Sequence, residues 1–202
     1  MSHLRYIFIL FCFFIETLSA QNFTIVPLAD VSVSNIPIEV EHYVTTTNGI
    51  MDVRIFRTHY GNGNTSQYQS YPLSRSEMDR LFNSGYAATT LWWTGTLPAS
   101  RALAFTNYTT LTSGGASVPS NGNYYSLEAT CTFVPTETGT YYFRMTSDDG
   151  SDLQIGNTSV IEWYGGKGVG QYRYGSISLV AGQQYYFKAR MQEYAGGDGL
   201  IV

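Results

Sequence analysis

The chain has 202 residues and a formal net charge of −4 at pH 7, and only 13% of its residues are charged. Its 11 lysines and arginines are scattered, which argues against a nucleic-acid partner, and no basic amphipathic helix is present to lie on a membrane surface. Tyrosine and glycine are abundant, with 17 and 20 residues. This composition is typical of an extracellular, strand-rich domain rather than of a cytosolic enzyme.

The first twenty residues have the pattern of a secretory signal peptide. His3 and Arg5 give a weakly basic start, residues 7–15 form an unbroken apolar run, and cleavage is expected after Ala20. The run is too short to span a bilayer, which takes about 20 apolar residues, and no later segment is suited to do so. We therefore expect an exported or cell-surface protein with a signal peptide at 1–20 and one domain at 21–202.

Four Asn-x-Ser/Thr sequons mark candidate N-glycosylation sites, which in an exported eukaryotic chain lie on surface loops. Chance occurrence is the alternative for each sequon, but four in one exported domain favour the use of at least one. Their asparagines are Asn22, Asn64, Asn107 and Asn157.

Short strands separated by clusters of Gly, Asn, Ser and Thr fill the region after the signal. In the first of them, Val53 and Ile55 alternate with polar neighbours. One helix follows, because Ser74 and Glu77 fit a capping box and Gly85 provides a stop. We expect this helix to be a short connector across the sheets rather than a part of the core.

Four later strands alternate between inward apolar residues and outward neighbours. This period of two, with turns at regular spacing, predicts an all-β fold, an antiparallel β-sandwich. The expected inward residues are Leu127, Ala129, Cys131 and Phe133, then Tyr141, Phe143 and Met145, then Ile177 and Leu179, and finally Tyr185, Phe187, Ala189 and Met191.

Cys131 is the one cysteine outside the predicted signal, because Cys12 lies within it. From its inward position we expect a buried, inert thiol, with an intermolecular disulfide as the alternative. An exported domain without a disulfide is held by its core or by a metal.

The most informative stretch is Ser147–Ile155, where Asp148, Asp149 and Asp152 place three carboxylates within five residues. Such charges repel one another unless solvent, a turn or a cation absorbs them. An Asp-Gly hairpin turn is one interpretation. A site for a hard cation such as Ca²⁺ is the other, since Ca²⁺ prefers oxygen ligands.

An ordered series of features surrounds this turn. It comprises Gly139–Met145 (an aromatic strand), Ser147–Ser151 (Ser-Asp-Asp-Gly-Ser), Leu153–Ile155, Val160–Trp163, Leu179–Gly182 (Leu-x-Ala-Gly) and Gln184–Tyr186, with Glu193 and Gly199–Leu200 behind them. This order resembles the protective-antigen (PA-14) domain family, well over 115–202 and faintly over 40–114. Gly156-Asn157 departs from the Asp-Gly of many members, and the chain stops inside the expected last strand, as a fragment would.

The resemblance implies a jelly-roll-like sandwich and a calcium-dependent lectin site. In the fungal adhesins of the family, two Asp residues joined by a cis peptide hold Ca²⁺, which binds sugar hydroxyls; Asp148 and Asp149 match that pair. A second loop adds oxygens, and the matching 193–198 offers Glu193 or Asp198 in place of the family's Asn. Either acid is alternatively a solvated turn residue, and Asp152 receives no metal role and is expected to face solvent.

Aromatic side chains near these loops are candidates to stack on sugar rings. Tyr164 and Tyr194 are the two residues expected to do so, whereas Trp163 matches a family residue that is usually in the core. Trp92-Trp93 is either an exposed patch or a core plug. Tyrosine is so frequent in this chain that either assignment rests on position alone.

Catalysis finds little support, since no nucleophile motif is visible and adjacent Asp148 and Asp149 are poorly placed to act on opposite sides of a glycosidic bond. We therefore do not expect an enzyme. Three hypotheses remain: a Ca²⁺-dependent carbohydrate-binding adhesion module with glycans or glycoproteins as partners; a structural or assembly module without sugar binding; and an accessory domain of a glycoside hydrolase.

Overall fold

A computed structural model describes residues 49–58, 71–83 and 89–202. In these residues the strands are β1 (Ile50–Thr58), β2 (Thr89–Pro98), β3 (Ala104–Phe105), β4 (Tyr125–Phe133), β5 (Gly139–Asp148), β6 (Ser151–Ile155), β7 (Thr158–Trp163), β8 (Arg173–Leu179), β9 (Tyr185–Glu193) and β10 (Gly199–Ile201). Short helices are α1 (Arg75–Leu81), α2 (Ala99–Ala102), α3 (Thr109–Ser113) and a 3₁₀ turn, η1 (Pro119–Gly122). The signal peptide, Asn22, Asn64, Gly85 and the start of the 21–202 domain lie outside the described residues, so these expectations stay predictions.

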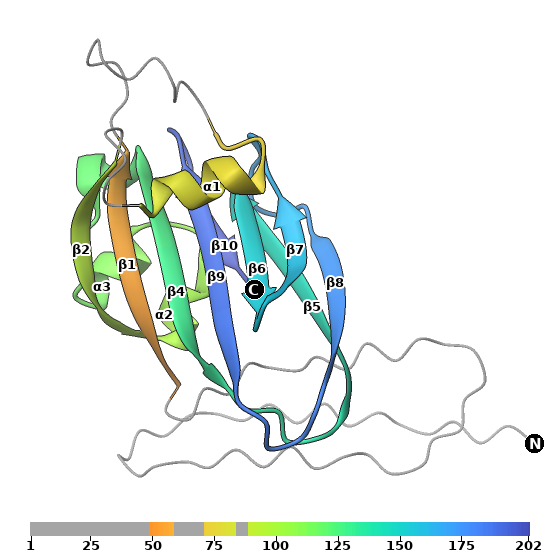
Figure 1. The fold of residues 1–202 in the computed structure, drawn as a ribbon. Helices are drawn as coiled ribbons and strands as arrows, with labels where there is room; N and C mark the ends of the chain where they lie inside the picture. The colour runs from red at the N-terminus through yellow and green to blue at the C-terminus, as the bar shows by residue number, and fades with distance from the viewer. Residues whose placement is uncertain (1–48, 59–70, 84–88) are drawn as a thin grey trace, which may run out of the picture. The chain divides into compact units, whose positions relative to one another are not determined.

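The strands form two antiparallel sheets (Figure 1), as the alternating pattern predicts. The six-stranded sheet has the order β2-β1-β4-β9-β6-β7, and the four-stranded sheet has the order β3-β10-β5-β8. Their facing sides bury one apolar core that draws on both sheets, including Val53, Leu127, Met145 and Met191, each with no exposed surface. The all-β sandwich is therefore confirmed. Of the helices in the described ranges, none has the length and hydropathy of a membrane span.

The inward residues expected from alternation are largely in this core. Tyr141, Phe143 and Met145 on β5 are buried, as are Leu127 and Ala129 on β4. Cys131 is only partly buried, although it packs against the core. Burial raises the pKa of its thiol to about 12, with the charge of Asp52 adding to the effect. Trp92 is 43% exposed, as expected of a surface patch, while Trp93 packs against the core. Each interpretation of the Trp92-Trp93 pair therefore holds for one residue.

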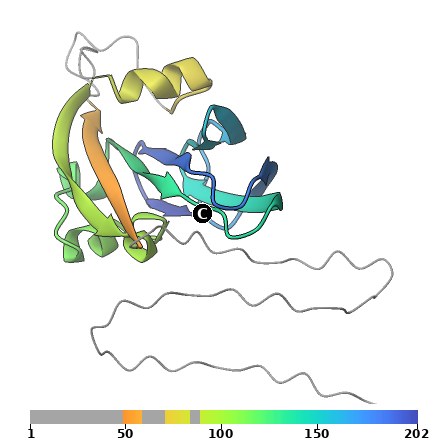
Figure 2. The same ribbon diagram turned by 60° about the horizontal axis from the view of Figure 1, so that its bottom comes forward.

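Helix α1 lies across the outer face of the six-stranded sheet, as two views of the ribbon show (Figures 1 and 2). Ser74 caps it, because its hydroxyl accepts a hydrogen bond from the Glu77 N–H at 3.3 Å. Met78 and Leu81 are fully buried and pack in a second apolar cluster with Phe56 of β1. A short helix across the sheets is present as expected, but the expectation that it takes no part in a core is wrong, because Met78 and Leu81 are buried in this second cluster.

The face under α1 also buries charge, which corrects a second expectation. Asp152, expected to face solvent, is only 3% exposed and pairs with Arg190, which is 2% exposed. Both residues sit at outward positions of their strands, where alternation predicts solvent. The helix covers that side of the sheet, so a paired charge is buried there instead.

Candidate functional site

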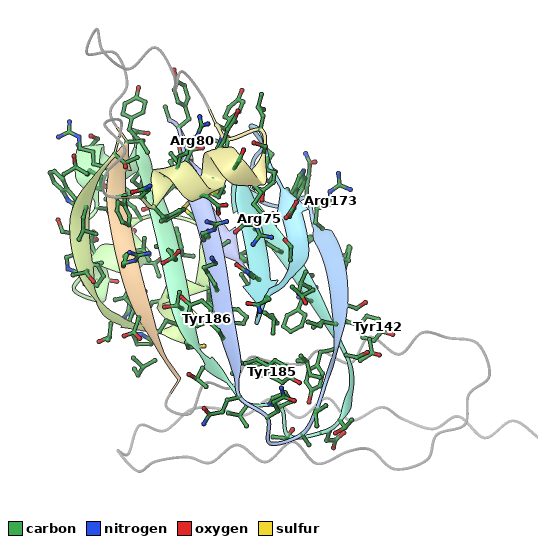
Figure 3. The ribbon with its side chains drawn as sticks, in the orientation of Figure 1. Arg75, Arg80, Tyr142, Arg173, Tyr185 and Tyr186 are labelled. Carbon is green, nitrogen blue, oxygen red and sulfur yellow. The ribbon has the colours of Figure 1, made fainter. Side chains whose placement is uncertain are left out.

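Three connections meet at the end of the sandwich where β5 and β9 finish. They are the β5–β6 turn at 148–150, the β7–β8 loop at 164–172 and the β9–β10 loop at 194–198. The turn is fixed to β9 by two backbone hydrogen bonds, from Asp149 N–H to the Gln192 carbonyl and from Gln192 N–H to the Gly150 carbonyl, both at 2.8 Å. In Figure 3 this end is marked by Arg173, which pairs with Met145 near the end of β5.

Asp148, Asp149 and Glu193 form a compact acidic cluster at this end. Each contributes one carboxylate oxygen, and these oxygens all lie within 4.8 Å of one another. The peptide bond between Asp148 and Asp149 is cis. Glu193 has no exposed surface and Asp149 is 6% exposed, whereas Asp148 is partly exposed. Solvent therefore reaches the cluster on the Asp148 side.

Asp149 is held by backbone groups from two different loops. Its Oδ1 accepts a hydrogen bond from the Lys167 N–H at 3.1 Å, and its Oδ2 accepts one from the Tyr194 N–H at 3.0 Å. The Lys167 ammonium donates to the Asp149 carbonyl and, at 2.8 Å, to the Trp163 carbonyl. Burial raises the pKa of Asp149, and the two N–H donors oppose that rise.

No described residue holds the Glu193 carboxylate in a comparable way. Both of its carboxylate oxygens are buried without a hydrogen-bond partner among the described residues. Burial, with the neighbouring charges of Asp149, Asp148 and Asp198 adding to it, raises the pKa of Glu193 to about 10. The same causes, burial first and then Asp149, raise the pKa of Asp148 to about 6. A buried carboxylate without a partner is costly, so this site favours a proton or a cation beside Glu193.

Asp198 lies near the cluster but is committed to other partners. Its Oδ2 accepts a hydrogen bond from the Tyr125 hydroxyl at 2.6 Å, and its Oδ1 accepts one from the Tyr108 N–H at 3.0 Å. It is 4% exposed. These contacts anchor the β9–β10 loop, which brings Gly197 so close to Asp148 that an added Cβ would lie 3.0 Å from Asp148 Oδ2.

The two tyrosines expected to stack on sugars lie in different surroundings. The Tyr194 ring makes edge contacts with Tyr124 and Tyr71 beside the cluster. The Tyr164 hydroxyl instead donates to Asp152 Oδ2 at 3.0 Å, and its ring packs against the apolar cluster under α1. Trp163 is partly buried, and the Lys167 ammonium lies 4.7 Å from its ring centroid.

Sequence reasoning missed one contributor, Lys167, and one neighbouring segment, Tyr71–Pro72, whose Tyr71 ring contacts Tyr194. In the sequence, Lys167 is the single cation of the run Gly-Gly-Lys-Gly at 165–168, and no spacing links it to Asp149. Tyr71–Pro72 precede the Asp pair by more than seventy residues.

Two of the predicted glycosylation sites fall in described residues, and both are exposed. Asn157 occupies the tight β6–β7 turn, and Asn107 Oδ1 accepts a hydrogen bond from the Thr109 N–H at 2.9 Å.

The cluster fits a hard cation on the chemistry of its donors. All three side chains offer carboxylate oxygens, the ligand type that Ca²⁺ prefers. Oxygens bound at about 2.3–2.6 Å from one ion can stand up to about 5 Å apart, which accommodates the observed spread. The oxygens of Glu193, which find no hydrogen-bond partner in the part of the chain that the structure describes, supply an independent reason for positive charge at this position.

Fold and site together define an all-β module with an oxygen-rich cluster of loops at one end. The family model of the PA14 domain matches residues 83–200, more than half of the chain. The chain belongs to the PA14 domain family. The match starts well before residue 115, where the resemblance in the sequence becomes clear.

Solved structures share the fold at low sequence identity. The PA14 sugar-binding domain from an RTX adhesin matches with a TM-score of 0.54 and 16% identity, over 75% of this chain and 86% of that one. The epithelial adhesin 6 A domain from Candida glabrata, solved in complex with Galb1-3GlcNAc, matches with a TM-score of 0.51 and 12% identity, over 74% and 76%.

A third match is to part of a larger protein. An anti-sigma factor domain-containing protein gives a TM-score of 0.50 and 14% identity over 74% of this chain, and this chain spans 40% of that protein. No curated protein sequence matches. At these identities the comparisons establish the fold.

Proposed function

We propose that this chain is an exported, Ca²⁺-dependent carbohydrate-binding module in which Asp148, Asp149 and Glu193 hold the cation. The observation that carries the proposal is the fully buried Glu193 carboxylate, whose oxygens have no hydrogen-bond partner among the described residues and lie beside the Asp pair. A bound Ca²⁺ would supply the missing positive charge and leave coordination positions open for sugar hydroxyls.

Each residue has a distinct role in this proposal. Asp149 is a fixed ligand, because N–H groups of Lys167 and Tyr194 hold both of its oxygens. Asp148 stands on the accessible side, where Gly197 and Gly168 approach its Oδ2 without side chains. The sugar would approach over these two glycines. Asp198 orients the second loop and is not assigned as a ligand.

Two relatives support the sugar-binding part of the proposal. One structure is described as a sugar-binding domain and the other contains a bound disaccharide. Export rests on the signal-like first twenty residues. We assign no catalytic residue.

The test compares thermal unfolding in excess Ca²⁺ and in chelator, for the wild type, Asp149→Asn and Glu193→Gln. A ligand that binds only the folded state at one hundred times its Kd adds about 2.7 kcal/mol to the free energy of unfolding. We expect a higher midpoint with Ca²⁺ for the wild type and little change for either variant. Asp52→Asn is the matched control, because Asp52 is exposed on β1 and distant in sequence from the cluster, and it should respond as the wild type does.

A glycan array then tests the second part of the proposal. Binding that disappears in chelator and in Asp149→Asn supports the lectin function. A Ca²⁺ response without any glycan binding would favour a structural or assembly module. The absence of a Ca²⁺ response would refute the proposed site.

A further inference from the structure

Three tyrosines from separate parts of the chain form a row next to the acidic cluster. Tyr71 precedes α1, Tyr124 precedes β4, and Tyr194 follows β9. The ring centroid of Tyr194 lies 6.3 Å from that of Tyr71 and 5.5 Å from that of Tyr124, with interplanar angles of 76° and 79°. All three side chains are partly exposed.

The row is continuous with the site through its middle member. The Tyr194 N–H donates to Asp149 Oδ2, so the backbone that carries the central ring also holds a carboxylate of the cluster. The backbone of the central tyrosine therefore lies within hydrogen-bond distance of the cluster, and its ring contacts the other two.

Tyr71 packs against the β7–β8 loop at Gly166, which has no side chain to block the ring. A Cβ on Gly166 would lie 2.4 Å from the Tyr71 ring, so a larger residue at 166 would force the ring to shift. The next residue, Pro72, accepts a hydrogen bond from the Gly165 N–H at 2.9 Å and packs on Gly150 of the Asp turn. The segment thus lies across two of the three site loops.

Tyr124 is placed by an uncommon backbone conformation. Its φ is +57°, a region that bulky residues rarely occupy. Hydrogen bonds hold the backbone on both sides, from the Tyr124 N–H to the Tyr194 carbonyl at 3.1 Å and from the Thr58 N–H to the Tyr124 carbonyl at 2.8 Å. Such conformations concentrate at ligand-binding positions, where the surrounding structure enforces them.

We infer that Tyr71, Tyr124 and Tyr194 form a second subsite, which receives the sugar ring next to the one bound at the carboxylates. The inference rests on the proposed function. A tyrosine offers an apolar ring for the C–H face of a pyranose and a hydroxyl for its oxygens. The ligand class is therefore a disaccharide or longer glycan, bound more tightly than the corresponding monosaccharide.

The experiment measures affinities by calorimetry in saturating Ca²⁺ for three pairs of probes: galactose with lactose, mannose with an α-linked mannobiose, and glucose with cellobiose. The variants are Tyr71→Leu, which keeps apolar contact with Gly166, and Tyr124→Asn, since Asn tolerates positive φ. Tyr142→Leu is the control. Tyr142 is 66% exposed on β5 and lies toward the opposite end of the sandwich from Arg173 (Figure 3).

For a pair that the wild type binds, we expect at least a tenfold preference for the disaccharide. Tyr71→Leu and Tyr124→Asn should reduce that preference about tenfold and leave the affinities for Ca²⁺ and for the monosaccharide unchanged, and Tyr142→Leu should have no effect. Equal affinity for both members of every bound pair, or an unchanged preference in both variants, overturns the subsite alone. Absence of Ca²⁺-dependent binding of all probes by the wild type overturns both the subsite and the proposed function.

Discussion

Arg190 holds Asp152 with two hydrogen bonds, from Nε to Oδ1 at 2.8 Å and from a terminal nitrogen to Oδ2 at 2.6 Å. Both side chains are nearly inaccessible to solvent, with 3% and 4% exposed. A second terminal nitrogen of Arg190 donates to Asp79 of α1 at 2.7 Å. One arginine of β9 therefore links a neighbouring strand and the covering helix.

Removing the carboxylate from this pair should destabilise the protein strongly. Asp152→Ala leaves Arg190 buried with Asp79 as its remaining acidic partner among the described residues, and losing one member of a buried pair costs about 3–5 kcal/mol. Asp79→Ala is the comparison, because that side chain is 53% exposed and exposed pairs contribute about 0–1 kcal/mol. Urea unfolding monitored by circular dichroism measures both. Similar losses for the two variants would contradict the importance of the buried contact.

Two neighbouring glycines allow a graded test of the approach to Asp148. An added Cβ would lie 3.0 Å from Asp148 Oδ2 in Gly197→Ala but 3.9 Å from the same atom in Gly168→Ala. If Asp148 binds Ca²⁺ as proposed, Gly197→Ala should weaken Ca²⁺ binding roughly tenfold, equivalent to about 1.4 kcal/mol, and Gly168→Ala should leave it intact. Calorimetric titration with Ca²⁺ gives both affinities, and an equal effect of the two changes would count against this geometry.

The metal-free protein should lose stability as pH rises. The pKa of Glu193 rises from its ordinary 4.5 to about 10 on folding, because of burial and the charges of Asp149, Asp148 and Asp198. Between these values the folded state retains a proton that the unfolded state has released, so the free energy of unfolding falls with increasing pH. Asp148, whose pKa rises to about 6, adds to this loss of stability in the acidic part of the same pH range.

Glu193→Gln provides the control for this dependence. Denaturant unfolding in chelator at pH 5, 7 and 9 should show a steep loss for the wild type and a shallower one for the variant, which cannot ionise at this position. Identical slopes in the two proteins would show that Glu193 does not carry the effect.

Cys131 should react slowly in the folded protein. Its pKa of about 12 keeps the thiol protonated at neutral pH, whereas the thiol of an unfolded cysteine has a pKa of about 8.5. Alkylation by iodoacetamide, followed by mass spectrometry, should level off above about pH 9 in urea but continue to accelerate beyond it in the native state. A native rate that already levels off near pH 9 would contradict the effect of burial.

The strands could be predicted from the sequence because burial on one face leaves a period of two, as in Tyr141, Phe143 and Met145. The buried pair of Asp152 and Arg190 could not, because alternation assigns charged outward residues to solvent. Their partnership spans 38 positions and depends on a helix from another part of the chain. For α1, the capping residues could likewise be recognised in the sequence. The sheet face that the helix covers could not, because that contact also joins distant parts of the chain.

At the candidate site, the resemblance identified Asp148 and Asp149 as a pair, but it did not decide whether Glu193 or Asp198 is the further ligand. Hydrogen bonding separates them, since Tyr125 and Tyr108 occupy the oxygens of Asp198 while those of Glu193 have no partner among the described residues. These partners lie 73 and 90 positions away from Asp198, beyond the reach of local spacing.

Tyr71 and Pro72 lie outside the region that the family model matches. Their contacts with Gly150, Gly165 and Gly166 nevertheless place them across the loops of the site. Substitutions in this segment can reshape the wall beside the carboxylates without altering any of them. If the carboxylates bind a cation and Tyr71 contacts a sugar as proposed, part of the ligand preference is encoded outside the stretch that carries the acidic centre, so that related proteins could diverge in what they recognise while inheriting the same centre.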